Sequence, residues 1–266
     1  MTMVNRAAPR PELTMVVPTY NERERLGALL EQIFAACDAR HLSVGVIVVD
    51  DNSADGTGAL ADEWARAGRV QVLHRAGKLG LGSAVIEGFR LAESDVVGVI
   101  DADLSHPPDL IPLLYETVVA HNLDMVVASR YVGAGRTASN WSLKRLILSR
   151  AGCWLSRPLT PVRDAMSGFF LLRRDRISRF ETSTSGFKIG LELLVRAGMR
   201  RVAEVDYAFV DREAGRSKMN LAECGRFLKQ LGRLYALAFS PSAVRPSHLV
   251  VPASTLHGPP TPVARA

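Results

Sequence analysis

Short runs of apolar residues alternate with amphipathic segments through the first half of the chain. After the first apolar run, Leu26, Leu30 and Ile33 recur at the spacing of one helix face. The pattern predicts strands at 13–17, 44–49, 69–74, 95–100 and 124–129 and helices at 22–37, 56–67, 81–93 and 107–121. Continuously apolar strands are typical of parallel strands that are buried on both faces. We therefore expect an α/β protein with a mostly parallel sheet and helices on both faces.

Beyond residue 130 the alternation is less regular. It predicts a basic helix at about 140–156, a strand at 168–173, a helix from about Lys188, a strand at 200–210 and an amphipathic C-terminal helix at about 220–239. The start of the chain is polar, and the segment from Pro241 onward is rich in proline and serine. We expect one domain over 13–239, with halves 13–129 and 130–239, between a disordered N-terminus (1–12) and a disordered tail (240–266).

Polar segments follow the first four predicted strands, namely "PTYNE", "DDNSADGT", "HRAGKLGLG" and "DADLSHPP". The carboxyl ends of parallel strands meet at one edge of a sheet, where α/β proteins bind their ligands. "GKLGLG" precedes a predicted helix whose backbone N–H groups would face an anion, although a simple tight turn explains it equally well. It matches neither the P-loop nor the complete dinucleotide fingerprint. Together the four loops predict a pocket for a phosphorylated ligand.

Two carboxylates, Asp101 and Asp103, stand close together where the fourth strand ends. Like charges at this spacing repel unless a cation or a proton lies between them. Carboxylate oxygens suit Mg²⁺ or Mn²⁺ better than zinc, and a pyrophosphate would share such an ion. Alternatively, Asp101 caps the strand and the next residues only open a helix. For the second pair, Asp50 and Asp51, helix capping by one residue and a ribose or base contact by the other are both open.

Charge is unevenly distributed along the chain. The net charge is +6, yet residues 130–179 contain eleven lysines and arginines against two acids. Such a dense basic stretch suggests an anionic partner: a phosphate group, a membrane surface or nucleic acid. Nucleic acid ranks last, because aromatic residues are scarce there and no nucleic-acid motif is present. No apolar run approaches the roughly 18 residues of a membrane span, and we expect no secretory signal. Cys37, Cys153 and Cys224 are far apart, as expected for small buried residues in a reducing compartment.

The order of several motifs resembles the dolichol-phosphate (polyprenol-phosphate) mannose synthases over residues 13–239. The motifs are "VVPTYNE", "VVDDNSADGT", "HRAGKLGLGSA", "DADLSHPPD", "SRY", "NWSLKRLILSR", "DAMSGFF", "GFKIGLELL" and "FVDREAGRSKMN". "D-R-x-x-G-x-S-K" and "W-x-x-x-R-x-x-x-S-R" are the most specific of them. The resemblance implies an inverting family 2 glycosyltransferase with the Rossmann-like, GT-A type fold of nucleotide-diphospho-sugar transferases. It implies transfer of a hexose, foremost mannose from GDP-mannose, to a polyprenyl or dolichyl phosphate.

The resemblance also assigns residues to roles. Those for the nucleotide sugar are Pro18, Tyr20, Glu22, Asp51, Lys78, Asp101, Ala102, Asp103, Arg212 and Lys218. Those for the acceptor phosphate are Arg130, Arg145 and Ser149, with Arg150 left to the membrane surface or a structural pair. Asp101 and Asp103 would bind Mg²⁺ or Mn²⁺, and the catalytic set would be Asp101, Asp103, Arg130 and Arg212. Ser105 stands where many prokaryotic members have a metal-binding Gln, which puts a third protein ligand in doubt; Asp164 and Glu192 stay open as sugar contacts.

The implied chemistry agrees with the residue types. A phosphate monoester has a second pKa near ~6, so it is already an anionic nucleophile at neutral pH. The reaction therefore needs cations and a metal more than a strong base.

Other members carry C-terminal membrane helices, and this chain shows none. We expect a cytoplasmic protein bound peripherally to the cytoplasmic face of a membrane, a location that admits a separate membrane-protein partner. The contact would be made by the helix at 220–239 or the one at 140–156, unless the apolar stripe of the former packs on the sheet. Two alternatives keep the fold: transfer from a UDP- or GDP-sugar to a soluble acceptor, and a non-catalytic membrane-surface protein.

Overall fold

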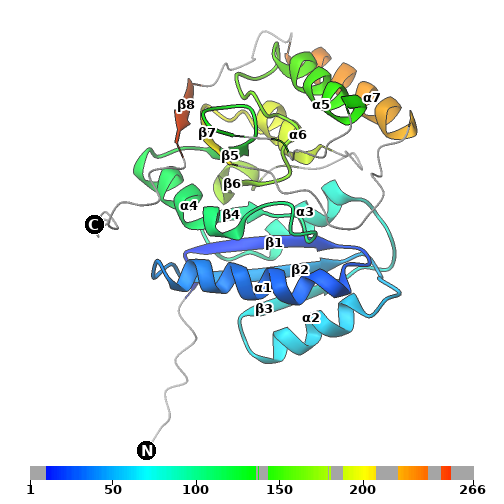
Figure 1. The fold of residues 1–266 in the computed structure, drawn as a ribbon, viewed down its shortest axis with the longest axis vertical. Coiled ribbons are helices and arrows are strands. Elements are labelled where there is room, and N and C mark those ends of the chain that lie inside the picture. The colour runs from blue at the N-terminus through cyan, green and yellow to red at the C-terminus, as the bar shows by residue number, and fades with distance from the viewer. Residues whose placement is uncertain are drawn as a thin grey trace, which may run out of the picture.

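The computed structural model describes residues 10–135, 137, 143–178, 180, 188–207, 221–238 and 247–252, apart from the side chains of 143–145 and 221–224. The first strands and helices lie at the lower end of Figure 1, and helices from the second half of the chain lie at the upper end. Of the predicted disordered N-terminus (1–12), residues 1–9 lie outside the described residues. The prediction is wrong for Glu12, whose backbone N–H donates to the carbonyl of Ser43 (2.9 Å).

The described helices and strands follow the predicted order. In chain order they are β1 (Leu13–Thr19), α1 (Arg23–Asp38), β2 (Val44–Asp50), α2 (Thr57–Arg66), β3 (Val70–His74), α3 (Leu81–Leu91), β4 (Val96–Val99), η1 (Pro108–Leu110), α4 (Ile111–Ala120), β5 (Met125–Ser129), α5 (Leu143–Ser156), β6 (Phe170–Arg173), η2 (Arg174–Ile177), α6 (Ile189–Arg196), β7 (Arg201–Asp206), α7 (Leu221–Ala238) and β8 (Ser247–Val251). The strands form one sheet in the order β3-β2-β1-β4-β6-β5-β7-β8.

Alternation along each strand directs side chains into two separate apolar layers. From β1, Met15 and Val17 join a core that α1 and α4 cover, whereas Val16 joins a second core beneath α3 and α6. Both faces of the sheet are thus buried, which explains why the strands are apolar at consecutive positions. The prediction of helices on both faces is confirmed.

Strand β6 is the exception to the parallel arrangement, because it runs antiparallel between β4 and β5. Phe170, Leu171 and Leu172 of this strand are buried. An apolar run of this kind is compatible with either direction, so the sequence pattern does not report the reversal.

The predicted disordered tail (240–266) is wrong for residues 247–251, which form strand β8. This strand pairs in parallel with β7, from Arg201 opposite Ser247 to Val205 opposite Val251. The prediction weighed the prolines of the tail and overlooked the short apolar run "LVV" that continues the sheet at its edge. The rest of the tail lies outside the described residues.

The amphipathic helix α7 packs one side of its apolar stripe inward. Leu231 and Leu234 are buried against Leu191 of α6, whereas Leu228 and Leu237 are more than half exposed. No helix of the described residues is long and apolar enough to cross a membrane.

Candidate active site

The second carboxylate pair has different roles at its two positions. Asp50 accepts hydrogen bonds from the backbone N–H of Ser53 (3.1 Å) and from the hydroxyls of Ser53 (2.6 Å) and Thr19 (3.1 Å). Asp55 accepts from the N–H of Thr57 (3.0 Å) at the start of α2. Asp50 therefore fixes the turn after β2. Neither residue of the pair caps α2, whose N-cap is Gly56, and Asp55 just before it accepts from the first N–H of the helix.

Asp51 is held by an arginine that the sequence analysis did not single out. Its carboxylate accepts from Arg75 Nη1 (2.6 Å) and from the N–H of Gly80 (3.4 Å), and Arg75 is 6% exposed. Arg75 in turn donates to Ser83 at the start of α3 (2.6 Å). This buried pair joins the loop after β2 to the glycine-rich loop. The nucleoside contact expected of Asp51 remains a prediction.

The loops after β1 and β3 also meet at this edge of the sheet. Lys78 Nζ lies 4.2 Å from the ring centroid of Tyr20, close enough for a cation–π contact. The Glu22 carboxylate accepts from Arg25 of α1 (3.3 Å). The structure thus brings together Tyr20 and Lys78, two residues to which the resemblance assigns nucleotide-sugar contacts. Pro18 lies near the end of β1, and Glu22 lies just before α1.

The loop after β4 holds the first carboxylate pair in two different environments. Asp103 is 5% exposed and accepts from the N–H of Ser105 (3.0 Å), whereas the side chain of Asp101 is 35% exposed. Leu104, directly after Asp103, has a φ of 59°, which turns the loop sharply. The side chain of Ala102 packs in the apolar core. A sugar-nucleotide contact at this position remains a prediction and would have to be made by the backbone.

Asp101 is positioned by a histidine and a glycine. His106 Nε2 lies 3.3 Å from Asp101 Oδ2, and His106 Nδ1 lies 3.0 Å from the hydroxyl of Tyr207. A Cβ atom at Gly168 would lie 3.0 Å from Asp101 Oδ2, so a larger residue would push the carboxylate away by a few tenths of an ångström. The closeness of the Asp101 carboxylate therefore favours glycine at this position of "DAMSGFF". The sequence analysis named neither His106 nor Tyr207, which lies 101 residues away from it.

The carboxylates fit a divalent cation by their chemistry. Asp101 and Asp103 supply hard oxygen ligands from one turn. In the part of the chain that the structure describes, no group of three or more His, Cys, Asp or Glu side chains could hold a metal. A cation at this turn would therefore complete its coordination with the oxygens of a bound diphosphate and with water. The assignment of Asp101 and Asp103 as metal ligands remains a prediction.

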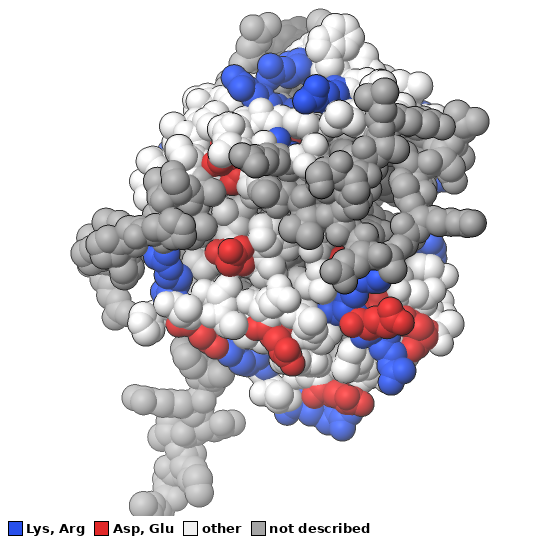
Figure 2. All heavy atoms as spheres, viewed as in Figure 1, with Lys and Arg blue, Asp and Glu red and all other residues white. Residues whose placement is uncertain are grey.

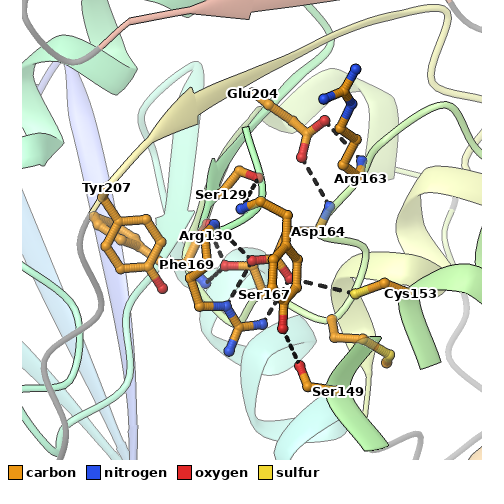
Figure 3. Close-up of polar contacts among 12 residues, drawn as sticks. Ser129, Arg130, Ser149, Cys153, Arg163, Asp164, Ser167, Phe169, Glu204 and Tyr207 are labelled. Carbon is orange, nitrogen blue, oxygen red and sulfur yellow. Dashed lines mark hydrogen bonds and ion pairs between the residues drawn. The ribbon is translucent and has the colours of Figure 1, made fainter. Parts of the chain in front are cut away.

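Arg130 is anchored by a buried, bidentate ion pair (Figure 3). Its Nε and Nη2 each donate to a different oxygen of Asp164 at 2.7 Å, and its backbone N–H donates to Asp164 at 2.9 Å. Asp164 is 0% exposed. Burial acts to lower the pKa of Arg130, but the charge and hydrogen bonds of Asp164 outweigh it and raise that pKa above its ordinary value. Arg130 is thus a fixed positive charge. Asp164, which the sequence analysis left open as a sugar contact, is its ion-pair partner.

Lys188 lies within electrostatic range of Asp101, Arg130 and Asp164. Its Nζ donates to the backbone oxygen of Met166 (3.1 Å). Burial lowers the pKa of Lys188, the charge of Arg130 lowers it further, and Asp101 and Asp164 oppose the shift. The sequence analysis gave Lys188 only as the start of a helix. Nothing in the local sequence "GFKIG" indicates that this lysine lies near charged residues of three other segments.

A pocket of about 450 Å³ opens beside Arg130. Its lining includes four arginines, Arg130, Arg150, Arg157 and Arg163. Tyr131 lines it too and shares a hydrogen bond of 2.8 Å with Ser149 of α5, which brings that predicted acceptor residue to its edge. Arg150, assigned to a membrane surface or a structural pair, lies in the pocket lining, and its assignment remains a prediction. Arg157 and Arg163 were not predicted.

The remaining predicted positions fall elsewhere. Glu192 is 2% exposed and is hydrogen-bonded to Arg196 of its own helix and to Gln230 of α7. It therefore joins α6 to α7, and the sugar contact left open for it remains a prediction. The side chain of Arg145 and all of Arg212 and Lys218 lie outside the described residues. In Figure 2, lysines and arginines gather at the upper end of the visible face, and acidic residues appear mainly below them.

Comparison with sequence families places the chain among transferases. The profile described as Glycosyl transferase family 2 matches residues 14–180. A polyprenol monophosphomannose synthase from Mycolicibacterium smegmatis is 39% identical over 225 residues, which cover 80% of this chain and 82% of the relative. A dolichol-phosphate mannosyltransferase from Saccharomyces cerevisiae is 33% identical over 238 residues, covering 86% and 88%.

A dolichol-phosphate mannosyltransferase from Pyrococcus furiosus is 37% identical over 227 residues, which are 84% of this chain. The match spans 63% of the length of that longer relative.

Solved structures share the fold at lower identity. A mannosyltransferase from Pyrobaculum calidifontis, solved with GDP-Man and Mn²⁺, superposes with a TM-score of 0.59 at 20% identity, covering 86% of this chain and 64% of the other. A glucosyl-3-phosphoglycerate synthase from Mycobacterium tuberculosis, solved with Mn²⁺ and UDP, gives 0.60 at 20% identity, covering 87% and 82%. These likenesses show the fold alone.

Proposed function

Because this chain belongs to glycosyl transferase family 2, we propose that it is an inverting enzyme that transfers mannose from GDP-mannose to a polyprenyl phosphate. Its sheet, with helices on both faces, is the GT-A type fold of nucleotide-diphospho-sugar transferases. The observation that carries the choice of acceptor is the arginine-lined pocket beside Arg130. The relatives named as mannosyl transferases to lipid phosphates support the donor and the lipid.

The arginine pocket suits a phosphate monoester. Guanidinium groups bind phosphate oxygens bidentately and keep their charge at every physiological pH. The acceptor phosphate has a second pKa near ~6, so it arrives as an anion and needs no base to become a nucleophile. Arg130, fixed by Asp164, would orient this phosphate, and Arg150, Arg157 and Arg163 would hold its charge at the pocket wall.

The carboxylate turn suits the leaving diphosphate. Asp101 and Asp103 would hold Mg²⁺ or Mn²⁺ together with the diphosphate of the donor. A bound divalent cation supplies electrostatic stabilisation of the departing diphosphate. His106 holds Asp101 in place, Gly168 leaves room for its carboxylate, and Lys188 lies within electrostatic range of both Asp101 and Arg130. Tyr20, Lys78 and Asp51 line the rim at which we place the nucleoside.

Helix α5 provides a surface for a lipid substrate. Trp154 is 73% exposed and Ile147 is 56% exposed, and both lie on the helix that carries Arg150. Apolar and basic side chains on one exposed helix are typical of segments that bind the interface of an anionic membrane. We place this helix at the cytoplasmic face of a membrane, with the arginine pocket facing the lipid phosphates. The exposed Leu228 and Leu237 of α7 belong to the same proposal.

A donor and acceptor panel tests the proposed function. Purified protein is incubated with radiolabelled GDP-mannose or UDP-glucose and with polyprenyl phosphate or 3-phosphoglycerate, with and without EDTA. The proposal predicts EDTA-sensitive transfer of label from GDP-mannose into the organic phase. If label enters only the water-soluble acceptor, the acceptor is a soluble metabolite and the proposed lipid acceptor is wrong. Absence of transfer in every combination would leave the non-catalytic alternative.

A further inference from the structure

Strand β7 carries a buried carboxylate at Glu204, among the apolar residues in the middle of the strand. The residue is 0% exposed, and its two neighbours in sequence, Ala203 and Val205, are buried too. Burying a carboxylate is costly unless donors compensate its charge. Glu204 is therefore a feature that packing alone does not explain.

Three donors compensate Glu204, and two of them belong to the loop that builds the arginine pocket. The backbone N–H groups of Arg163 and Asp164 donate to its two oxygens at 2.8 and 2.9 Å. Figure 3 shows Glu204 reaching this loop from its strand. Asp164 is the residue that grips Arg130, and Arg163 lines the pocket itself. Glu204 thus fixes the backbone from which both arginines are positioned.

The third donor comes from the edge strand β8. His248 Nε2 lies 2.8 Å from Glu204 Oε2, and because a carboxylate only accepts, the ring N–H is the donor. His248 pairs with Val202 in the parallel register. Residues two apart on a strand share a face, so His248 and Glu204 point to the same side of the sheet. The histidine ring is 20% exposed and covers the carboxylate from the solvent side.

We propose that strand β8, acting through His248 and Glu204, positions the arginines that receive the acceptor phosphate. The chain of contacts runs from His248 to Glu204, from Glu204 to the backbone of Asp164, and from the Asp164 carboxylate to Arg130. This inference rests on the proposed function, because it takes Arg130 as an acceptor-phosphate residue. His248 and Glu204 are positioning residues that touch no substrate.

Loss of the histidine donor leaves Glu204 with the two backbone donors only. The carboxylate would then draw water or shift toward solvent, and the loop of Arg163 and Asp164 would move with it. Displacements of about 1 Å in a positioning group reduce rates by up to about 100-fold. The donor side is spared, since Asp101 and Asp103 are held by contacts of their own to His106 and Ser105.

The test is steady-state kinetics of full-length His248→Ala with a short-chain polyprenyl phosphate, beside calorimetric titration with GDP-mannose. We expect kcat/KM for the lipid acceptor to fall about 10- to 100-fold, while GDP-mannose affinity changes less than about twofold. His248→Gln keeps an amide N–H donor and should restore most of the activity. Leu249→Ala, on the opposite face of the same strand, is the matched control and should resemble wild type.

The outcomes separate this inference from the proposed function. A wild-type protein that transfers nothing to polyprenyl phosphate defeats the proposed function. A wild-type protein that is active, with His248→Ala equally active, defeats the positioning role alone. If GDP-mannose affinity and kcat/KM for the acceptor fall together, or if His248→Gln does not recover activity, then His248 has only a structural role and the proposal is wrong. Should His248→Ala not fold, His248→Leu replaces it, because leucine keeps the side-chain volume and removes the donor.

Discussion

Asp101 and Asp103 occupy one turn but differ in exposure, which decides how each should be substituted. Asp103 is buried and caps the N–H of Ser105, so truncating it would disturb the loop as well as the site. Replacement by Asn keeps the hydrogen-bonding oxygen and removes the charge.

Asp101→Asn and Asp103→Asn should each lower transfer by at least about 100-fold, because removal of one group that stabilises developing charge costs about that much. Both variants should also lose the Mn²⁺ binding that paramagnetic resonance detects in the presence of GDP. The matched control is Asp109→Asn, an exposed carboxylate of the following helical turn. Retained activity and Mn²⁺ binding in either variant would remove that residue from the proposed site.

The arginines of the pocket separate into one buried and three exposed side chains. Arg130→Ala leaves Asp164 as an unpaired buried charge and should destabilise the fold by about 3–5 kcal/mol. Arg150→Ala and Arg157→Ala should leave the melting temperature near that of wild type while raising KM for the lipid acceptor. The exposed Arg90 on α3 supplies the control substitution. Unchanged acceptor kinetics in both exposed variants would take the acceptor phosphate out of the pocket.

Two cysteines give a prediction about pH. Burial raises the pKa of Cys37 and of Cys153 to about 12, from a usual 9.0. Between those values an unfolded chain loses the thiol protons that the folded chain keeps, so these groups reduce stability as pH rises above 9.0. Iodoacetamide at pH 8.5 should therefore label neither thiol in the folded Cys224→Ser protein, and should label both in urea. Rapid labelling of the folded protein would contradict the burial of these side chains.

Helices and strands were predicted well where periodicity determines them. The predicted helix at about 220–239 is α7 (Leu221–Ala238), and the basic helix is α5 (Leu143–Ser156). The direction of β6 and the existence of β8 were not predicted, because both depend on neighbours that lie far away in the chain. A short apolar run has the same appearance in either direction and at either edge of a sheet.

The two faces of α7 show why the apolar stripe alone could not locate the membrane contact. Leu231 and Leu234 pack against α6, so this part of the apolar stripe stabilises the fold and is not available to a membrane. The exposed apolar side chains of α5 have no such partner among the described residues, and Trp154 is the most exposed of them at 73%.

Trp154→Ser should weaken flotation of the protein with anionic liposomes, and wild-type flotation should decrease as salt rises. The control is Leu91→Ser, which removes an apolar side chain that is 46% exposed at the C-terminal end of α3. Equal flotation of the two variants would place the membrane contact elsewhere. Absence of any wild-type binding at low salt, even with polyprenyl phosphate in the vesicles, would contradict peripheral docking.

Across the molecule, sequence reasoning located the edge of the sheet that carries the site and missed the contacts that hold it rigid. The carboxylate turn and Arg130 were named from motifs at the ends of strands. Their partners were not, because Arg75, His106, Lys188 and Glu204 contact residues that only folding brings near. His106 and Tyr207, for example, are 101 residues apart. The partner of a buried polar residue can be identified only in the folded structure.

The central claim is that a lipid phosphate, gathered by the arginine pocket, attacks the sugar whose diphosphate the carboxylate turn holds. It is tested most directly with a polyprenyl phosphate whose terminal phosphate oxygens carry ¹⁸O, incubated with GDP-α-mannose and Mg²⁺. The organic-phase product is analysed by mass spectrometry and by NMR at the anomeric carbon. The account predicts a β-linked mannosyl phosphate that retains all of the ¹⁸O, since the acceptor oxygen becomes the bridge. A product with α configuration, loss of label, or no mannosylated lipid at all would contradict it.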